Sequence, residues 1–160
     1  FTDIWTEIRG RLQDLPDDEL RDRAAAFPFE IPYRLLSMYS VYGDTVLDPF
    51  WGTGTTSLAA MVAGRNSIGY ERDRAFLDHF DAQTSEIPAM SRAVTEQRLS
   101  DHRDFLSDRG ETPDYESEHY GFPVMTSQEK QLRLYTAAEI SETPEGYRVS
   151  HEPAEDSISL

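Results

Sequence analysis

The sequence predicts a protein of the α/β class, built around one βαβ unit of a mostly parallel sheet. Two short apolar segments, at residues 45–48 and 67–70, have the character of buried strands. A glycine-containing turn and a helix with one apolar face connect them, at residues 49–64. The second strand leads into an acidic residue, Glu71. A strand, a crossover helix and a strand in this order form a parallel pair.

Composition limits the possible classes of protein. The 160 residues suit one modest domain, and a hydrophobic content of 38% supplies a thin core. The formal net charge is −15, and Lys130 is the single lysine. This acidity predicts a salt-adapted, halophilic protein, although an ordinary acidic bacterial protein has the same signature.

Other totals bear on location. The sequence has no cysteine, no apolar run as long as a membrane span and no signal-peptide pattern, which together predict a cytoplasmic protein. It starts at Phe1, from which we expect an excised or truncated piece of a longer product.

Residues 1–26 are predicted to be a connector or packing arm. Ile4, Trp5 and Ile8 share one helical face, which Pro16 interrupts. Trp5 could stack on a nucleic-acid base, but a single Trp on an apolar helical face is more often a core residue.

The next segment is expected to be extended and then helical. Prolines at 28 and 32 favour an extended chain over residues 27–32, which could lie along a ligand. Pro32 can occupy the first helical position of a helix that ends before Gly43. In the crossover helix, Thr55 and Thr56 are expected to cap the start, and Gly64 suits a left-handed end.

The turn after the first strand has the features of a cofactor loop. Gly52 and Gly54 allow a tight turn, and the following helix N-terminus exposes unpaired N–H groups. Asp48 would repel a pyrophosphate but attract a sulfonium or ammonium group. Glu71 could accept two hydrogen bonds from a ribose diol. The pattern therefore favours S-adenosylmethionine over NAD.

Two further observations bear on this interpretation. Phe50 and Trp51 could cover an adenine or meet a cation. The dinucleotide fingerprint fails at its third glycine, where Ser57 stands. The alternative is an ordinary strand-to-helix turn with a surface glutamate.

Downstream, the pattern predicts two helices and a hairpin. A helix follows at residues 72–80, and a longer one runs from about Ser85 to Leu106 and ends at 108–110. A loop is expected over 111–123. Residues 132–140 and 147–150 are predicted to form a hairpin across 144–146, followed by a frayed tail.

Other chemistry has little support in the sequence. The four histidines lack ligand spacing, so no metal site is expected, and no strained nucleophile motif supports a Ser–His–Asp triad. The arginines of residues 72–109 alternate with carboxylates, which indicates a solvated surface rather than a DNA face.

One family combines these motifs. The segment from Asp48 to Thr56, followed by Gly64-Arg65 and by Ile68-Gly69-Tyr70-Glu71, resembles the cofactor motif of DNA methyltransferases that modify the exocyclic amine of cytosine or adenine. Residues 27–36 resemble the Pro-containing segment that precedes this motif in the permuted branch, and residues 3–5 resemble the Asp-x-Trp segment before that. The resemblance extends from residue 3 to about residue 80.

The resemblance implies a partial Rossmann-like methyltransferase fold with a C-terminal extension. On this basis residues 27–110 form the S-adenosylmethionine-binding region and 111–160 the extension. The residues expected to bind the cofactor are Asp48, Pro49, Phe50, Gly52, Thr53, Gly54, Thr55, Thr56, Glu71, Phe29 and Pro32.

No catalytic residue is expected in this chain. The family holds the target amine with a Pro-Pro-aromatic motif, and the sequence has no Pro-Pro pair. The resemblance therefore implies a cofactor-binding half, inactive alone, with DNA and a missing N-terminal half or a separate catalytic polypeptide as partners. A regulatory module that lost the chemistry and, with less support, an NAD-dependent oxidoreductase remain alternatives.

Overall fold

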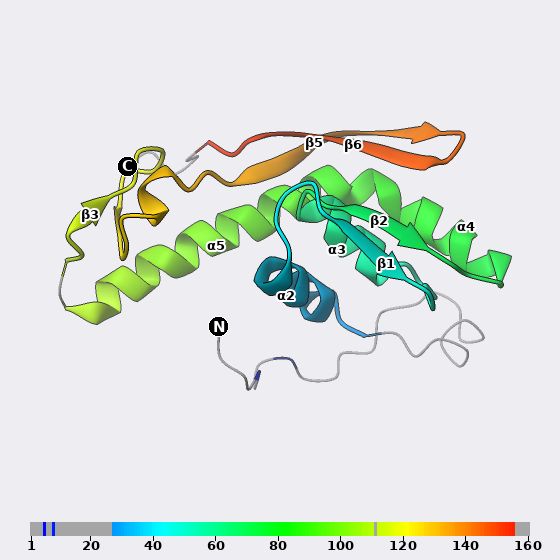
Figure 1. Cartoon of the computed structure of the whole chain (residues 1–160), viewed down its shortest axis with the longest axis horizontal. Helices are drawn as coiled ribbons and strands as arrows, with labels where there is room; N and C mark the ends of the chain where they lie inside the picture. Colours follow the sequence, from blue (N-terminus) through cyan, green and yellow to red (C-terminus); the bar gives the residue numbers. More distant parts are fainter. Residues whose placement is uncertain (1–4, 6–7, 9–26, 111, 156–160) are drawn as a thin grey trace.

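A computed structural model of the chain describes residues 5, 8, 27–110 and 112–155. The predicted arm at 1–26, apart from residues 5 and 8, and the end of the predicted frayed tail, at 156–160, lie outside the described residues. Within the described part, helices pack along a two-stranded parallel sheet, and a long hairpin runs along one side (Figure 1).

The predicted βαβ unit is confirmed. Strand β1 (Thr45–Asp48), helix α3 (Thr55–Val62) and strand β2 (Asn66–Gly69) follow one another. The two strands pair in parallel, with Leu47 opposite Ile68. Among the described residues this sheet has two strands, β1 and β2. The architecture is thus mixed α/β with a small parallel sheet.

Helix α3 begins differently from the prediction. Its N-cap is Gly54, which has a left-handed φ of 75°, and no side chain caps the helix. The expectation that Thr55 or Thr56 caps it is wrong, because the chain enters the helix through a left-handed residue. At the other end, Gly64 has a φ of 70°, as predicted for the helix end.

Helix α2 spans Glu30–Tyr39, two residues earlier than predicted. Phe29 already has helical dihedrals, so the extended segment is limited to residues 27 and 28. Pro32 lies in the first turn, where a helix tolerates proline because its missing N–H would have no intrahelical partner. The first-turn bonds run from Ile31 N to Pro28 O (3.1 Å) and from Tyr33 N to Phe29 O (3.2 Å).

The two later helices match the sequence pattern closely. Helix α4 (Arg74–Gln83) starts at Asp73, whose Oδ1 accepts from Ala75 N at 3.0 Å. A short 3-10 turn, η1 (Thr84–Glu86), leads into α5 (Ile87–Arg109). Gly110 ends α5 with a φ of 74°.

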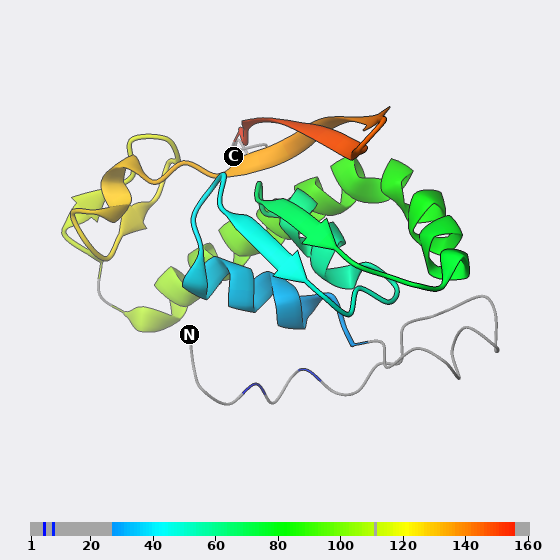
Figure 2. The same ribbon diagram turned by 45° about the vertical axis from the view of Figure 1, so that its right-hand side comes forward.

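The C-terminal part contains two antiparallel pairs. Strands β3 (Tyr115–Glu116) and β4 (Pro123–Val124) form a small pair inside the predicted loop, and η2 (Glu129–Gln131) follows. The predicted hairpin is confirmed with other bounds: its first strand starts later than residue 132, and its second strand is longer than expected. It consists of β5 (Tyr135–Thr143) and β6 (Gly146–Pro153) and lies over α3 and α5 (Figure 2).

The hairpin shares its core with the βαβ unit. Ala137 of β5 is buried together with Leu58 of α3 and Phe80 of α4. Ser91 of α5 is fully buried, and its Oγ lies 2.9 Å from the Ala137 N–H, which donates to it. The same hydroxyl lies 3.3 Å from Val62 O and donates to it. One side chain therefore ties α5 to both α3 and β5.

None of the described helices combines the length and the apolar composition needed to cross a membrane.

Candidate functional site

The carboxyl ends of β1 and β2 lie at the same edge of the sheet because the strands are parallel. Beyond these ends the two connecting segments are joined by backbone hydrogen bonds. Tyr70 N donates to Asp48 O at 3.0 Å, and Trp51 N donates to Tyr70 O at 3.1 Å. Ligands of open α/β sheets bind at this position, outside the carboxyl ends of the strands.

The glycine loop, residues 48–54, leaves β1 in a tight turn. Asp48 Oδ1 accepts from Phe50 N at 3.1 Å, which closes an Asx turn at the strand end. Gly52 and Gly54 have φ values of 54° and 75°, in the region that favours glycine. A Cβ on Gly54 would lie 2.4 Å from the Phe80 ring and 2.6 Å from the Trp51 ring. A glycine is thus required at position 54, because φ is positive there and because two aromatic rings leave no room for a Cβ.

Glu71 connects the end of β2 to the glycine loop. Its Oε2 accepts from Gly52 N at 2.9 Å. Its Oε1 accepts from Arg72 N at 2.7 Å and from Asp73 N at 2.8 Å. These N–H donors, that of Asp73 above all, hold the pKa of the Glu71 carboxyl below its ordinary value.

The glutamate has limited capacity for a further ligand. A carboxylate has about four acceptor positions, and backbone donors occupy three of them here. A diol that takes two hydrogen bonds would therefore displace one backbone donor. The contact between Glu71 and Gly52 spans 19 residues of sequence and makes the loop and the acid one unit.

The threonines after Gly52 point inward. Thr53 and Thr55 are buried, and their Oγ1 atoms lie 3.0 Å apart. Thr56 is half-buried. The N-cap residue of α3, Gly54, makes no side-chain capping bond.

The remaining expected residues are divided between surface and core. Pro49 is exposed, and Phe50 is 89% exposed. Phe29 stacks on Tyr33 with ring centroids 5.5 Å apart, and Pro32 is buried in α2. Phe29 also packs against the buried cluster of α2 and α3. It supports the helix behind the glycine loop.

Trp51 takes a position that sequence reasoning missed. Its Nε1 donates to Ser57 Oγ at 2.7 Å, and Ser67 Oγ lies 3.0 Å from the same oxygen. A Cβ on Gly69 would lie 2.0 Å from the indole, so the ring rests directly on the β2 backbone. An isolated glycine inside a strand often marks such a close approach, and Gly69 was the available signal.

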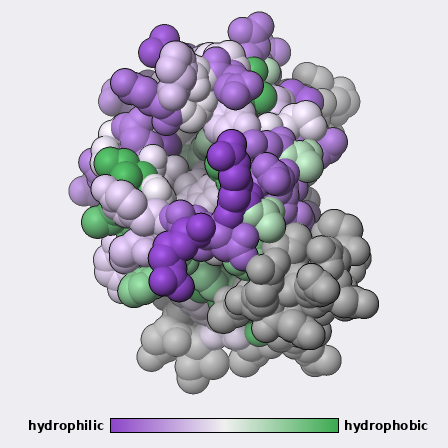
Figure 3. All heavy atoms as spheres, turned by 90° about the vertical axis from the view of Figure 1, so that its right-hand side faces the viewer, coloured by the Kyte–Doolittle hydropathy of each residue, from purple (hydrophilic) through white to green (hydrophobic). Residues whose placement is uncertain are grey.

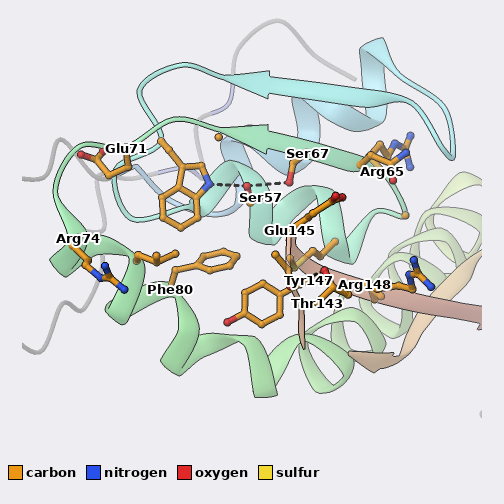
Figure 4. Close-up of a pocket in the computed structure, with 18 of the residues that line it drawn as sticks. Ser57, Arg65, Ser67, Glu71, Arg74, Phe80, Thr143, Glu145, Tyr147 and Arg148 are labelled. Carbon is orange, nitrogen blue, oxygen red and sulfur yellow. Dashed lines mark hydrogen bonds between the residues drawn. The ribbon is translucent and has the colours of Figure 1, made fainter. Parts of the chain in front are cut away.

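An open cavity of about 910 Å³ lies beside this unit, between β2, α4 and the turn of the hairpin (Figure 4). Glu71 lines it, as do Trp51 and Gly69. Asp48, Phe50, Gly52 and Phe29 are not among the described residues that line it. It is bordered by both signs of charge, from Arg65, Arg72, Asp73, Arg74, Glu145 and Arg148.

Figure 3 shows the molecule from the side toward which β1 and β2 point. Hydrophilic side chains dominate the part of this face drawn in colour, and small separate hydrophobic patches interrupt them. Among the described residues no group of three His, Cys, Asp or Glu side chains is arranged to hold a metal ion.

Comparison with known proteins identifies the same part of the chain. Residues 1–82 match the model of a family described as DNA methylase. The chain is 50% identical over 135 residues to the type II methyltransferase M.MthZI of Methanothermobacter thermautotrophicus, an alignment that covers 84% of this chain and 38% of the relative. It is 56% identical over 75 residues to the type II methyltransferase M.MjaI of Methanocaldococcus jannaschii, covering 47% of this chain and 24% of that relative.

A third relative is the type II methyltransferase M.BglI of Bacillus subtilis, 45% identical over 56 residues, or 35% of this chain and 16% of the relative. The chain thus spans well under half the length of these curated relatives. No solved structure matches it significantly.

Proposed function

The chain belongs to the DNA methylase family, and we propose that it is the cofactor-binding part of a site-specific methyltransferase acting on an exocyclic amine of cytosine or adenine. S-adenosylmethionine is the methyl donor that membership of this family implies. One observation carries the proposed site: the Glu71 carboxylate is bonded to Gly52 N beyond the ends of two parallel strands.

The proposed contacts follow from charge and position. The Glu71 carboxylate would accept a hydrogen bond from a ribose hydroxyl at the acceptor position that the backbone donors leave open. Asp48, half-buried at the end of β1, would attract the cationic part of the cofactor. The backbone of Gly52, Thr53 and Gly54 would approach the ligand closely because the glycines carry no side chain.

The other expected residues have supporting roles in this proposal. The exposed ring of Phe50 would cover the bound cofactor, next to Pro49. The N-terminal turn of α3, with Thr55 and Thr56, would lie against the bound cofactor. Phe29 and Pro32 would hold α2 against the site from behind.

The proposed chemistry is direct transfer between two bound molecules. The amine nitrogen would attack the sulfonium methyl carbon, the bond from that carbon to sulfur would break with its electron pair passing to sulfur, and the amine would release a proton to solvent. Positioning is the main contribution of a protein to such a step. The residues proposed here bind and orient the donor, and we assign none of them to the amine. The Pro-Pro-aromatic motif that would hold the base is absent from these 160 residues.

We propose that DNA and the catalytic motif are brought by further polypeptide, either on the same chain or separate. Leu47 and Ile68 lie opposite each other on the sheet and are 61% and 50% exposed. Parallel sheets are nearly always covered on both faces, so this apolar face suits a second layer of structure. Both outer edges of the sheet also lack a strand partner among the described residues.

Calorimetric titration with S-adenosylmethionine in concentrated potassium chloride tests the cofactor proposal. We expect saturable binding that Asp48→Ala and Glu71→Ala abolish and that NAD does not compete away. Asp44→Ala is the matched control, because the Asp44 carboxylate also accepts one backbone N–H, that of Val41 at 2.8 Å, and the residue lies just before β1, away from the site. Equal loss of binding in Asp44→Ala, or competition by NAD, would contradict the proposal.

Sedimentation of the isolated chain tests the proposal about the apolar face. We expect association that Leu47→Glu reduces. A cooperatively melting monomer with an unchanged melting temperature in Leu47→Glu would count against a covered face.

A further inference from the structure

The β5–β6 hairpin lies outside the residues that match the family model, which end at residue 82. Its tip nevertheless reaches the elements beside the glycine loop. Tyr147, near the start of β6, points its ring toward Phe80 of α4 (Figure 4). The two ring centroids are 5.9 Å apart in an edge arrangement, and Phe80 lies 4.7 Å from the Trp51 ring. Three aromatic rings therefore connect the hairpin to the loop.

Each ring in this series is held in place. The Tyr147 hydroxyl donates to Asp81 Oδ1 at 2.6 Å, which ties the hairpin tip to α4. Phe80 is only 2% exposed. The Trp51 indole donates to Ser57 Oγ. The series thus consists of packed rings with fixed ends, and a close-packed interior transmits displacement.

The last ring belongs to the glycine loop itself. Trp51 O accepts from Gly54 N at 2.9 Å, and Gly54 O accepts from Leu58 N at 2.9 Å. The indole also lies so close to Gly54 and Gly69 that neither position has room for a Cβ. A shift of Phe80 would therefore shift Trp51 and the backbone that precedes α3.

The hairpin itself has two further anchors, so its tip is not a free loop. His151 Nε2 lies 2.7 Å from Met61 O at the end of α3. Ala137 N donates to the buried Ser91 hydroxyl. These bonds fix β6 on α3, the helix that follows the glycine loop, and β5 on α5. Within the hairpin, Tyr147 is the residue whose ring begins the aromatic series that leads to the glycine loop.

We propose that Tyr147 is a positioning residue for the cofactor loop: through Phe80 it holds Trp51, and so keeps Gly52 in register with Glu71. The hairpin is then a support of the cofactor site that the family-matching residues alone do not contain. The effect that this inference predicts on affinity for S-adenosylmethionine rests on the proposed function. The position of Trp51, in contrast, can be measured without any ligand.

The test uses the full chain in a Trp5→Phe background, so that Trp51 is the single tryptophan. Two variants of Tyr147 are compared. Tyr147→Ala removes the ring, whereas Tyr147→Phe keeps the ring and removes the hydroxyl with its bond to Asp81. The readouts are acrylamide quenching of Trp51 fluorescence and the dissociation constant for S-adenosylmethionine.

Two controls separate positioning from general stability. Tyr42→Phe removes a hydroxyl that accepts from Tyr135 N at 3.2 Å at the other end of the hairpin. Ile140→Ala truncates a partly buried residue of β5 in the same core. Both are expected to lower the melting temperature and to leave quenching and affinity unchanged.

We expect Tyr147→Ala to increase quenching of Trp51 and to weaken cofactor binding about tenfold, since a small misplacement at a binding site is costly. Tyr147→Phe should restore both readouts. A folded Tyr147→Ala protein with wild-type quenching overturns the inference, as does an equal effect in Ile140→Ala. If Tyr147→Ala does not fold, Tyr147→Leu, which keeps apolar volume, is judged by the same readouts.

Failure of the proposed function gives a different pattern. If no variant and no wild-type protein binds the cofactor, yet Tyr147→Ala alone exposes Trp51, then the positioning role stands and the assigned ligand is wrong.

Discussion

Alanine substitutions at three glycines separate the two requirements on the backbone at Gly54, a left-handed φ and a space too small for a Cβ. Gly43 has a φ of 84° and nothing within 4 Å of an added Cβ. An added Cβ on Gly69 would lie 2.0 Å from the Trp51 ring, and this residue has no left-handed φ. Gly54 combines a φ of 75° with an added Cβ 2.4 Å from Phe80. Alanine at these positions therefore adds strain, overpacking, or both.

The expected losses in the free energy of unfolding follow from these two terms. A left-handed alanine costs about 1–2 kcal/mol, and the reduced freedom of the unfolded chain offsets part of that. Overpacking a filled site costs about 1–3 kcal/mol. We therefore expect Gly43→Ala to lose about 1 kcal/mol and Gly54→Ala about 2–4 kcal/mol. Gly69→Ala should fall between them.

Urea unfolding followed by circular dichroism at constant potassium chloride measures these differences, because urea leaves the ionic strength unchanged. Circular dichroism is preferred to fluorescence since Trp51 is itself displaced in two of the variants. A loss in Gly54→Ala no larger than that in Gly43→Ala would refute the argument that Phe80 and Trp51 fill the space beside the loop.

Three further results are expected. Folding lowers the pKa of Glu71 from 4.5, so its charge stabilises the native state above about pH 4.5. The difference in stability between wild type and Glu71→Gln should therefore shrink on acidification below that value. A difference that is independent of pH would contradict this. Burial and the bond to Asp81 raise the pKa of Tyr147 from 10.0 to about 12, so the stability of the native state should fall as the pH rises from 10 to 12. Thermal melts of Tyr147→Phe should lack that loss. Ser91→Ala leaves the Ala137 N–H buried without its partner and should lower the free energy of unfolding in urea by about 1–3 kcal/mol. An unchanged urea midpoint would show that water replaces the hydroxyl.

The acidity of the chain also predicts salt dependence. The formal charge of −15 repels itself in the folded state, and salt screens that repulsion. We expect the melting temperature to rise with potassium chloride over the molar range. A melting temperature that falls or stays constant would remove the support for a salt-adapted protein.

Local sequence was sufficient for most of the elements around the glycine loop. Asp48-Pro49 ends β1 and Gly64 ends α3, because each of these residues restricts or frees the backbone at its own position, whereas the expected threonine cap of α3 was wrong. The end of α5 at Gly110 and the hairpin turn before Gly146 were predictable for the same reason.

Other features depended on residues far apart in the chain. Helix α2 begins before Pro32, and Phe29 and Tyr33 at its start pack against buried residues of α2 and α3, a contact that no local pattern indicates. The small β3–β4 pair was hidden in a segment of loop composition, and Tyr120 and Phe122, between its two strands, are buried in a cluster with Leu99 of α5. The inward position of Trp51 required knowledge of what lies above Gly69.

The sequence by itself determined the βαβ order, the glycine turn and the acid that follows β2, because dihedral preferences and side-chain charge are properties of single residues and their neighbours. Only the tertiary structure decided that Glu71 would bond Gly52, 19 residues away, and that Tyr147 would reach Phe80. Such contacts depend on how helices and hairpin pack around a shared core, and packing is determined by the whole set of buried surfaces at once.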